Sequence, residues 1–123
     1  MQILVAGLGR FGRNLAVTLA HVGHDVIAVD MSDHVVQDIA HEIQTAVCGD
    51  ATDEEVLREI GAQDIQLAIV AMAEIEASVL ITTHLKNLNV PLVYAKASSD
   101  IHRTILERVG ADRVIFPEQE IAV

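Results

Sequence analysis

The chain has 123 residues, enough for one domain with a buried core but few for two. Hydrophobic residues make up 51%, aromatic residues 2%, and the formal net charge is −10. This charge disfavours binding to nucleic-acid backbones and to anionic lipid, and so few rings disfavour stacking on single strands or sugars.

No apolar run approaches the roughly 18 residues that a bilayer span requires, so we expect no direct membrane insertion. The chain begins with a strand-like segment at residues 1–5 rather than with a secretory signal. Its single cysteine, Cys48, excludes an internal disulfide and fits a reducing compartment; we expect it at the buried end of a strand. Together these features predict a cytoplasmic α/β domain.

Short β-branched runs alternate with longer helical segments, which is typical of parallel strands joined by crossover helices. The runs are almost continuously apolar, as in strands that are covered on both faces. Six strands with five connections predict a Rossmann-like, doubly wound parallel sheet with three αβα layers. The expected strands are residues 3–6, 25–30, 45–48, 67–72, 92–96 and 113–116.

Glycine and polar residues mark the ends of the expected helices. Gly23, Gly61 and Gly110 each follow a helical pattern, where a left-handed residue can close the last turn. Thr52 is expected to be an N-cap, with Glu55 three residues later completing a capping box.

A glycine-rich segment, Gly7-Leu8-Gly9-Arg10-Phe11-Gly12, follows the first strand and opens a helix. In this dinucleotide-binding pattern Gly7 permits the tight turn, Gly9 lets a phosphate approach the backbone, and Gly12 lets helix and strand pack closely. The free N–H groups at the helix start then face an anion. An ordinary tight turn would also explain the glycines by themselves. Other residues must therefore distinguish a nucleotide-binding loop from such a turn.

Asp30 ends the second expected strand, 18 residues beyond Gly12. A carboxylate there can accept hydrogen bonds from both hydroxyls of an adenosine ribose, and its charge disfavours the 2′-phosphate of NADP. Arg10, at the mouth of the helix, can pair with a terminal phosphate. Turn or capping roles for Asp30 and a solvated surface role for Arg10 are the alternatives. With the glycines, these residues predict nucleotide binding.

Several motifs occur in a characteristic order: Gly-Leu-Gly-Arg-Phe-Gly at 7–12, Val-Asp at 29–30, Gly-Asp-Ala-Thr at 49–52, Glu-Ala-Ser at 76–78 and Gly-Ala-Asp-Arg-Val-Ile-Phe-Pro-Glu at 110–118. In this order the chain resembles the RCK, or KTN, nucleotide-binding domains that regulate bacterial potassium transport. The resemblance covers essentially the whole chain and is strongest to the regulatory subunit of Ktr-type transporters. It implies that residues 1–123 form the N-terminal (TrkA-N) domain, without the C-terminal RCK subdomain.

The resemblance also implies a set of site residues. The glycine loop and Lys96 would meet the phosphates, Asp30 would hold the ribose, and Glu118 would help to place a cation beside a γ-phosphate near a dimer interface. The implied nucleotide contacts are Gly7, Gly9, Arg10, Phe11, Gly12, Asp30, Met31, Gly49, Asp50, Ala51, Thr52, Ala71, Met72, Ala73 and Lys96.

Ktr-type regulatory subunits bind ATP or ADP and assemble as rings of dimers on the cytoplasmic face of a membrane pore. The resemblance therefore implies a homodimer, an octameric ring for a full-length chain, a membrane-embedded potassium transporter or channel as partner, and gating by nucleotide exchange. Glutathione-gated efflux systems and Trk-type relatives carry similar segments and are associated with NAD, NADH and AMP. These nucleotides remain alternatives, as does the choice between a divalent and a monovalent cation.

The NAD-binding domain of an oxidoreductase is the alternative function. Against it, Tyr94 is the only tyrosine, and its spacing to Lys96 lacks the helical separation of a short-chain dehydrogenase base. No second domain is present to hold a substrate, so we expect no enzyme. The six histidines are expected at surface or packing positions, because no pair has the spacing and the supporting carboxylate of a zinc site.

Overall fold

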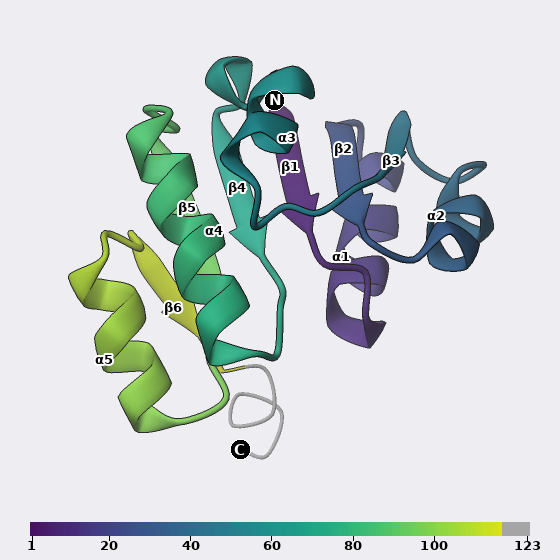
Figure 1. Cartoon of the computed structure of the whole chain (residues 1–123). Coiled ribbons are helices and arrows are strands. Elements are labelled where there is room, and N and C mark those ends of the chain that lie inside the picture. The colour runs from purple at the N-terminus through teal and green to yellow at the C-terminus, as the bar shows by residue number, and fades with distance from the viewer. Residues whose placement is uncertain (117–123) are drawn as a thin grey trace.

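The computed structural model describes residues 1–116. Within them, strands and helices alternate along the chain, as Figure 1 shows, with one short 3-10 helix, η1 (Ala62–Asp64). The strands are β1 (Gln2–Ala6), β2 (Asp25–Asp30), β3 (Thr45–Cys48), β4 (Leu67–Val70), β5 (Leu92–Lys96) and β6 (Arg113–Ile115). The helices are α1 (Arg10–His21), α2 (Asp33–Ile39), α3 (Glu54–Glu59), α4 (Ile75–Asn87) and α5 (Asp100–Arg108).

All strand pairs are parallel, and the sheet has the order β3-β2-β1-β4-β5-β6. The order reverses between β1 and β4, which creates the switch point where doubly wound sheets bind ligands outside the carboxyl ends of their strands. The predicted Rossmann-like fold is therefore confirmed. Strand β4 ends two residues earlier than expected: Ala71 N–H still donates to Ala6 O at 2.8 Å, and the chain then leaves the sheet.

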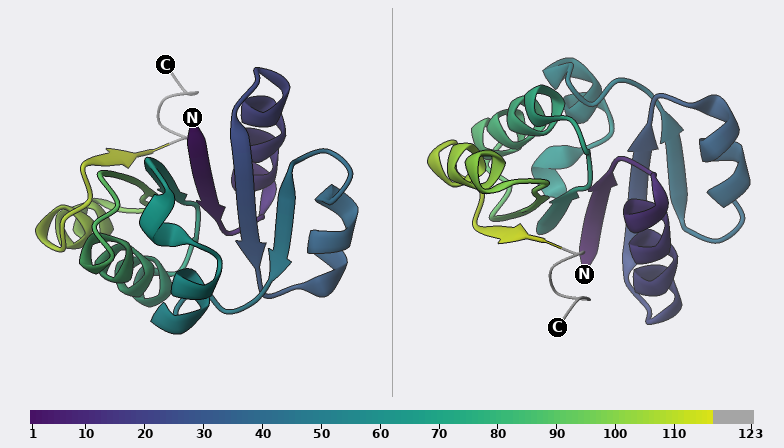
Figure 2. Two further views of the ribbon diagram at one scale, coloured as in Figure 1. Left: turned by 90° about the horizontal axis from the view of Figure 1, so that it is seen from above. Right: turned by 90° about the horizontal axis from the view of Figure 1, so that it is seen from below.

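Alternate side chains of the strands enter two separate cores, one on each face of the sheet. Helices cover both faces, which gives the predicted three layers (Figure 2). On one face α1 and α2 cover β1, β2 and β3. On the other face α3, α4 and α5 pack together over the rest of the sheet. Each fully buried Leu, Ile or Val contributes roughly 1.5–3 kcal/mol. Among the largest such side chains are Ile3, Leu4, Ile39, Leu57, Ile81, Leu85 and Leu106.

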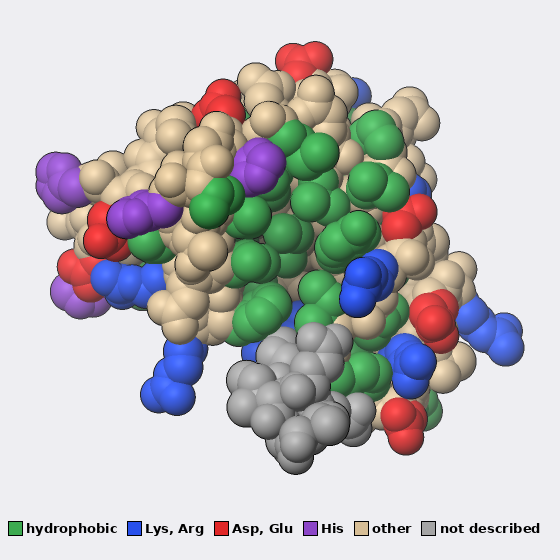
Figure 3. Space-filling model, turned by 180° about the vertical axis from the view of Figure 1, so that it is seen from behind, with side chains coloured by type: hydrophobic (Ala, Val, Ile, Leu, Met, Phe, Trp, Pro, Cys, Tyr) green, Lys and Arg blue, Asp and Glu red, His purple; other side chains and the backbone are tan. Residues whose placement is uncertain are grey.

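The face that carries α1 and α2 also exposes hydrophobic surface beyond those helices. Leu67 and Tyr94 are half-buried there, and Leu92 is 41% exposed. Figure 3 shows hydrophobic side chains gathered in the middle of this face. Among residues 1–116, no helix has both the length and the apolar character that crossing a bilayer requires.

The glycines that were predicted to end helices do so. Gly23, Gly61 and Gly110 have φ angles of +102°, +85° and +109°, the left-handed conformation expected after a last helical turn. At the opposite end of a helix, Ser99 caps α5 by accepting a hydrogen bond from His102 N–H at 3.1 Å.

The predicted capping box at Thr52 is wrong. Asp53 is the N-cap of α3, and its carboxylate accepts a hydrogen bond from Glu55 N–H at 3.0 Å. The Thr52 hydroxyl is engaged elsewhere, because it donates to Asp50 Oδ1 at 2.6 Å. This local turn delays the helix by one residue.

The predicted burial of Cys48 is also wrong. Its side chain is exposed, because β3 is an edge strand and Cys48 lies at its carboxyl end. The thiol donates to the carbonyl oxygen of Met31 at 3.4 Å.

Candidate nucleotide-binding site

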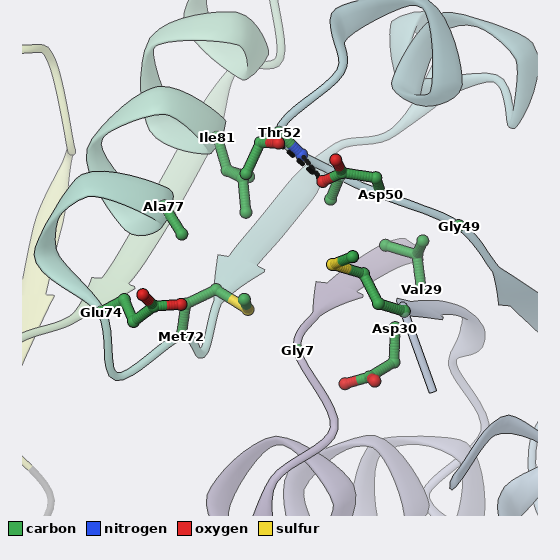
Figure 4. Close-up of a pocket in the computed structure, with 12 residues that line it drawn as sticks. Gly7, Val29, Asp30, Gly49, Asp50, Thr52, Met72, Glu74, Ala77 and Ile81 are labelled. Carbon is green, nitrogen blue, oxygen red and sulfur yellow. Dashed lines mark hydrogen bonds between the residues drawn. The ribbon is translucent and has the colours of Figure 1, made fainter. Parts of the chain in front are cut away.

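A two-part pocket opens at the carboxyl edge of the sheet, beside the switch point. Its two hollows share the residues Gly7, Asp30, Met72 and Glu74. The first, which we call the α4 hollow, lies between the end of β2, the 49–52 loop and helix α4 (Figure 4). The second, the glycine-loop hollow, lies between residues 7–11, residues 71–74 and the end of β5.

The three glycines of the motif meet different demands. Gly7 has a φ of +98°, and a Cβ there would lie 2.6 Å from Met72 Sδ. A Cβ on Gly12 would collide with the carbonyl oxygen of Gly7, so packing of the helix against the loop requires glycine there. A Cβ on Gly9 would meet no atom of the described chain within 4 Å. The fold thus explains Gly7 and Gly12, whereas Gly9 leaves open space over the loop.

The start of α1 carries positive potential into the glycine-loop hollow. Gly9 is its N-cap and supplies no side-chain capping bond, and the N–H groups of a first helical turn have no intrahelical acceptor. Arg10 is exposed at this end of the helix. On the other side of the hollow, Lys96 Nζ lies 5.8 Å from the centroid of the Phe11 ring. Arg10, Lys96 and a helix N-terminus, all of which favour an anion, therefore line this hollow together with the carboxylates of Asp30 and Glu74.

Asp30 is held against the glycine loop by main-chain donors. Its Oδ2 accepts a hydrogen bond from Leu8 N–H, and its Oδ1 accepts one from Ser32 N–H, both at 2.8 Å. The turn role considered for Asp30 is therefore real. Because each carboxylate oxygen can accept a further hydrogen bond, Asp30 can also bind hydroxyl groups of a ligand at the junction of the two hollows.

Asp50 is a fixed carboxylate on the wall of the α4 hollow. Its Oδ1 accepts hydrogen bonds from Thr52 Oγ1–H and from Thr52 N–H, at 2.6 and 2.9 Å. These two bonds, the side-chain bond most, hold the pKa of Asp50 below its ordinary value. The carboxylate therefore stays ionised and can accept a hydrogen bond from a ligand amine.

The structure brings together every predicted nucleotide contact except Gly12, which is buried beneath the loop. Met72 and the exposed Met31 line the α4 hollow with Gly49 and Ala51; Ala71 and the exposed Ala73 line the glycine-loop hollow. Glu118 lies outside the described residues, so the cation role stays a prediction.

Residues 3–117 match the family model described as the TrkA-N domain. The chain belongs to the TrkA-N domain family. The match confirms the resemblance to RCK, or KTN, domains. Ktr system potassium uptake protein A of Bacillus subtilis (strain 168) is 41% identical to this TrkA-N domain in an alignment 123 positions long, which covers 99% of this chain and 55% of that protein. The chain thus spans about half the length of that relative.

Solved structures support the fold of this TrkA-N domain. The TrkA-N domain of the inner membrane protein ybaL from Escherichia coli aligns with a TM-score of 0.90 and 22% identity, covering 98% of this chain and 90% of that one. The GsuK channel bound to NAD aligns at a TM-score of 0.83 and 20% identity, covering 98% and 22%. GsuK bound to ADP aligns at 0.81 and 21% identity, covering 93% and 30%.

Sequence reasoning missed Glu74, which lines both hollows of the TrkA-N domain. It is the N-cap of α4, with no side-chain capping bond, and Figure 4 shows it on the opposite side of the pocket from Asp30. A signal was available: Glu74 follows β4, and the carboxyl ends of parallel strands meet at one edge of the sheet. The pocket thus has a carboxylate on each side of Gly7.

Sequence reasoning also missed a buried pair between α4 and α5. Ser78 Oγ and His102 Nε2 lie 2.6 Å apart, and both residues are fully buried. Ser98 N–H donates to His102 Nδ1 at 3.1 Å, so Nδ1 carries no proton and the neutral ring holds its proton on Nε2. Nε2–H then donates to Ser78, whose hydroxyl donates to Ile75 O at 3.0 Å.

This pair is not a nucleophile with its base. The imidazole acts as a donor to the hydroxyl, and burial, which lowers the pKa of His102, favours the neutral ring. Tyr94, the other candidate catalytic group, is half-buried against the core on the α1 and α2 face of the sheet and lines neither hollow. Residues 1–116 also contain no group of three His, Cys, Asp or Glu side chains placed to hold a metal ion.

Proposed function

We propose that this chain is a nucleotide-sensing regulatory domain of a potassium transport system, without catalytic activity. One observation carries the proposal: an open helix N-terminus at Gly9 and the Asp30 carboxylate meet in one pocket at the switch point. Membership of the TrkA-N family and the name of the Bacillus subtilis relative support the link to potassium uptake.

In this proposal an adenine nucleotide occupies both hollows. The phosphates lie over the start of α1, between Arg10 and Lys96, where charge-assisted hydrogen bonds are strongest. The ribose hydroxyls donate to Asp30. The base enters the α4 hollow beside Met72, with its exocyclic amine near the ionised Asp50.

ATP or ADP is the proposed ligand, with NAD, NADH and AMP as alternatives. Arg10, Lys96 and the open start of α1 favour a ligand with phosphate charges over the glycine loop, and Asp30 opposes a 2′-phosphate. GsuK, which shares the fold, is described in solved structures as bound to ADP and to NAD. Glu118 is retained as the proposed site of a cation beside a γ-phosphate.

Regulation follows if the two nucleotide states favour different assemblies. Exchanging a triphosphate for a diphosphate changes the charge beside Arg10, and a ligand shifts an equilibrium by its differential affinity for the two states. We propose that a homodimer, extended to an octameric ring in a full-length chain with a C-terminal RCK subdomain, conveys this shift to a membrane-embedded potassium transporter from its cytoplasmic side.

The test is calorimetry with ATP, ADP, AMP and NAD, preceded by mass spectrometry of any copurified ligand. Replacing Arg10 by Gln should weaken ATP binding roughly tenfold while changing AMP binding less, because the lost charge meets the distal phosphates. Arg13→Gln is the matched control: Arg13 is on the same helix, but it faces Asp38 at 3.8 Å. No binding of any of the four nucleotides by the folded wild type would refute the proposal.

A further inference from the structure

His102 joins two segments of the β4–β5 side, each of which follows residues that line the glycine-loop hollow. One is the turn after β5, residues 97–99, which follows Lys96; its Ser98 N–H donates to the ring. Ser99 Oγ accepts from His102 N–H, so the side chain and the main chain of His102 hold the same turn. Ala97 N–H donates to Ile115 O at 2.9 Å, which leaves the turn little freedom on the sheet side.

The other partner of the ring belongs to the first turn of α4. Ser78 accepts from Nε2–H and donates to Ile75 O, directly after the 71–74 segment that lines the glycine-loop hollow. The imidazole therefore spans from the turn that follows Lys96 to the helix that follows Glu74. Both ring nitrogens are used, and the ring is fully buried.

We infer that His102 is a positioning residue for the nucleotide phosphates. By holding the turn after β5 and the start of α4 at a fixed separation, it keeps Lys96 and residues 71–74 placed around the glycine-loop hollow. This inference rests on the proposed nucleotide function. The nucleoside contacts, Asp30 and Asp50, belong to β2 and the loop after β3, to which His102 makes no hydrogen bond.

The two hydrogen bonds of the His102 ring, to Ser98 and to Ser78, require a neutral ring. A proton on Nδ1 would face Ser98 N–H, and two donors cannot share that hydrogen bond. No described charged group compensates: Glu74 and Glu76 from α4, Lys96 from β5, and Asp100 and Arg103 from α5 make no hydrogen bond or ion pair with the ring. Phosphate affinity should therefore fall when His102 is protonated.

The experiment compares ADP with adenosine as probes, by calorimetry and NMR titration of the whole chain at pH 7.5. His102→Gln retains an amide near Ser78 but cannot accept from Ser98 N–H. We expect its affinity for ADP to fall about tenfold, the effect of one misplaced phosphate contact, with adenosine affinity unchanged. Thr82→Val is the matched control, a buried α4 substitution whose hydroxyl has no hydrogen-bond partner within residues 1–116.

Three results separate the claims. If His102→Gln binds ADP as tightly as wild type, or loses ADP and adenosine affinity equally, the positioning role is overturned. If wild type binds neither probe, the proposed function itself fails. Should the variant not fold, 15N NMR of the wild-type imidazole still decides. A neutral ring protonated on Nε2 at pH 7.5 supports the inference, and a charged ring or a proton on Nδ1 overturns it.

Discussion

The two sides of the pocket are held in place by different means. On the β1–β3 side, main-chain groups do the positioning: Gly7 N–H donates to Val29 O at 3.0 Å, Leu8 N–H to Asp30, and Gly49 N–H to Asp30 O at 3.0 Å. On the β4–β5 side a chain of side chains does so, through His102 and Ser78. The first side depends on backbone shape and on the Asp30 carboxylate, whereas the second depends on a buried histidine, which can respond to protonation.

The largest expected effect is a loss of stability from a substitution on the β1–β3 side of the pocket. Gly12→Ala places a Cβ against the carbonyl oxygen of Gly7, and neither main-chain segment can move away cheaply. We expect the free energy of unfolding to fall by about 3 kcal/mol or more. Urea denaturation followed by circular dichroism measures this, and an unchanged midpoint would contradict the packing role of Gly12.

Gly9→Ala is the matched substitution, because it adds the same methyl group three residues before Gly12, at the N-cap of α1. Its Cβ meets no described atom, so stability should change by less than about 1 kcal/mol, the cost of a poorer N-cap. Nucleotide affinity should fall at least about tenfold, since the methyl group occupies the space proposed for a phosphate. If a stable Gly9→Ala protein binds ADP as tightly as the wild type, the phosphates do not bind at this loop.

The pH dependence of stability tests the role of His102 on the β4–β5 side of the pocket. Burial lowers the pKa of His102 in the folded state, so the unfolded chain binds a proton more readily. The contribution of neutral His102 to the free energy of unfolding is fully present above about pH 6.5, the ordinary pKa of histidine. It is lost as the pH falls towards the lower pKa of the folded state. His102→Gln should flatten this part of the profile. Identical profiles for variant and wild type would place the titration on another histidine.

The smallest expected effect concerns Thr82, which is fully buried on α4. Its hydroxyl has no partner within the described chain, so Thr82→Val removes a buried unsatisfied group. We expect stability to be unchanged or to rise by about 1 kcal/mol, as measured by urea denaturation. A clear loss of stability would mean that the hydroxyl has a partner in solution.

The β1–β3 side could be predicted from the sequence because its signals are local. Gly7, Gly9 and Gly12 fall at a strand–helix junction, and Asp30 ends the next strand, so pattern and spacing suffice. The strands themselves were predictable because parallel strands covered on both faces are continuously apolar.

The β4–β5 side was less predictable because its contacts depend on tertiary placement. Ser78 and His102 are 24 residues apart, and only the packing of α4 on α5 brings them to 2.6 Å. Thr52 was misassigned because a local hydrogen bond to Asp50 competes with capping. Cys48 was misjudged because the sequence does not say which strand lies at the edge of the sheet.

In the proposed binding mode, Asp30 binds the ribose of a nucleotide whose phosphates lie over Gly9. Replacing Asp30 tests this poorly, because its carboxylate also holds Leu8 and Ser32. The ligand can be changed instead: calorimetry of the wild-type chain with ADP and with 2′,3′-dideoxy-ADP leaves the protein intact. Hydrogen bonds to a charged group predict at least about tenfold weaker binding of the dideoxy compound. Equal affinities for the two ligands would contradict the account.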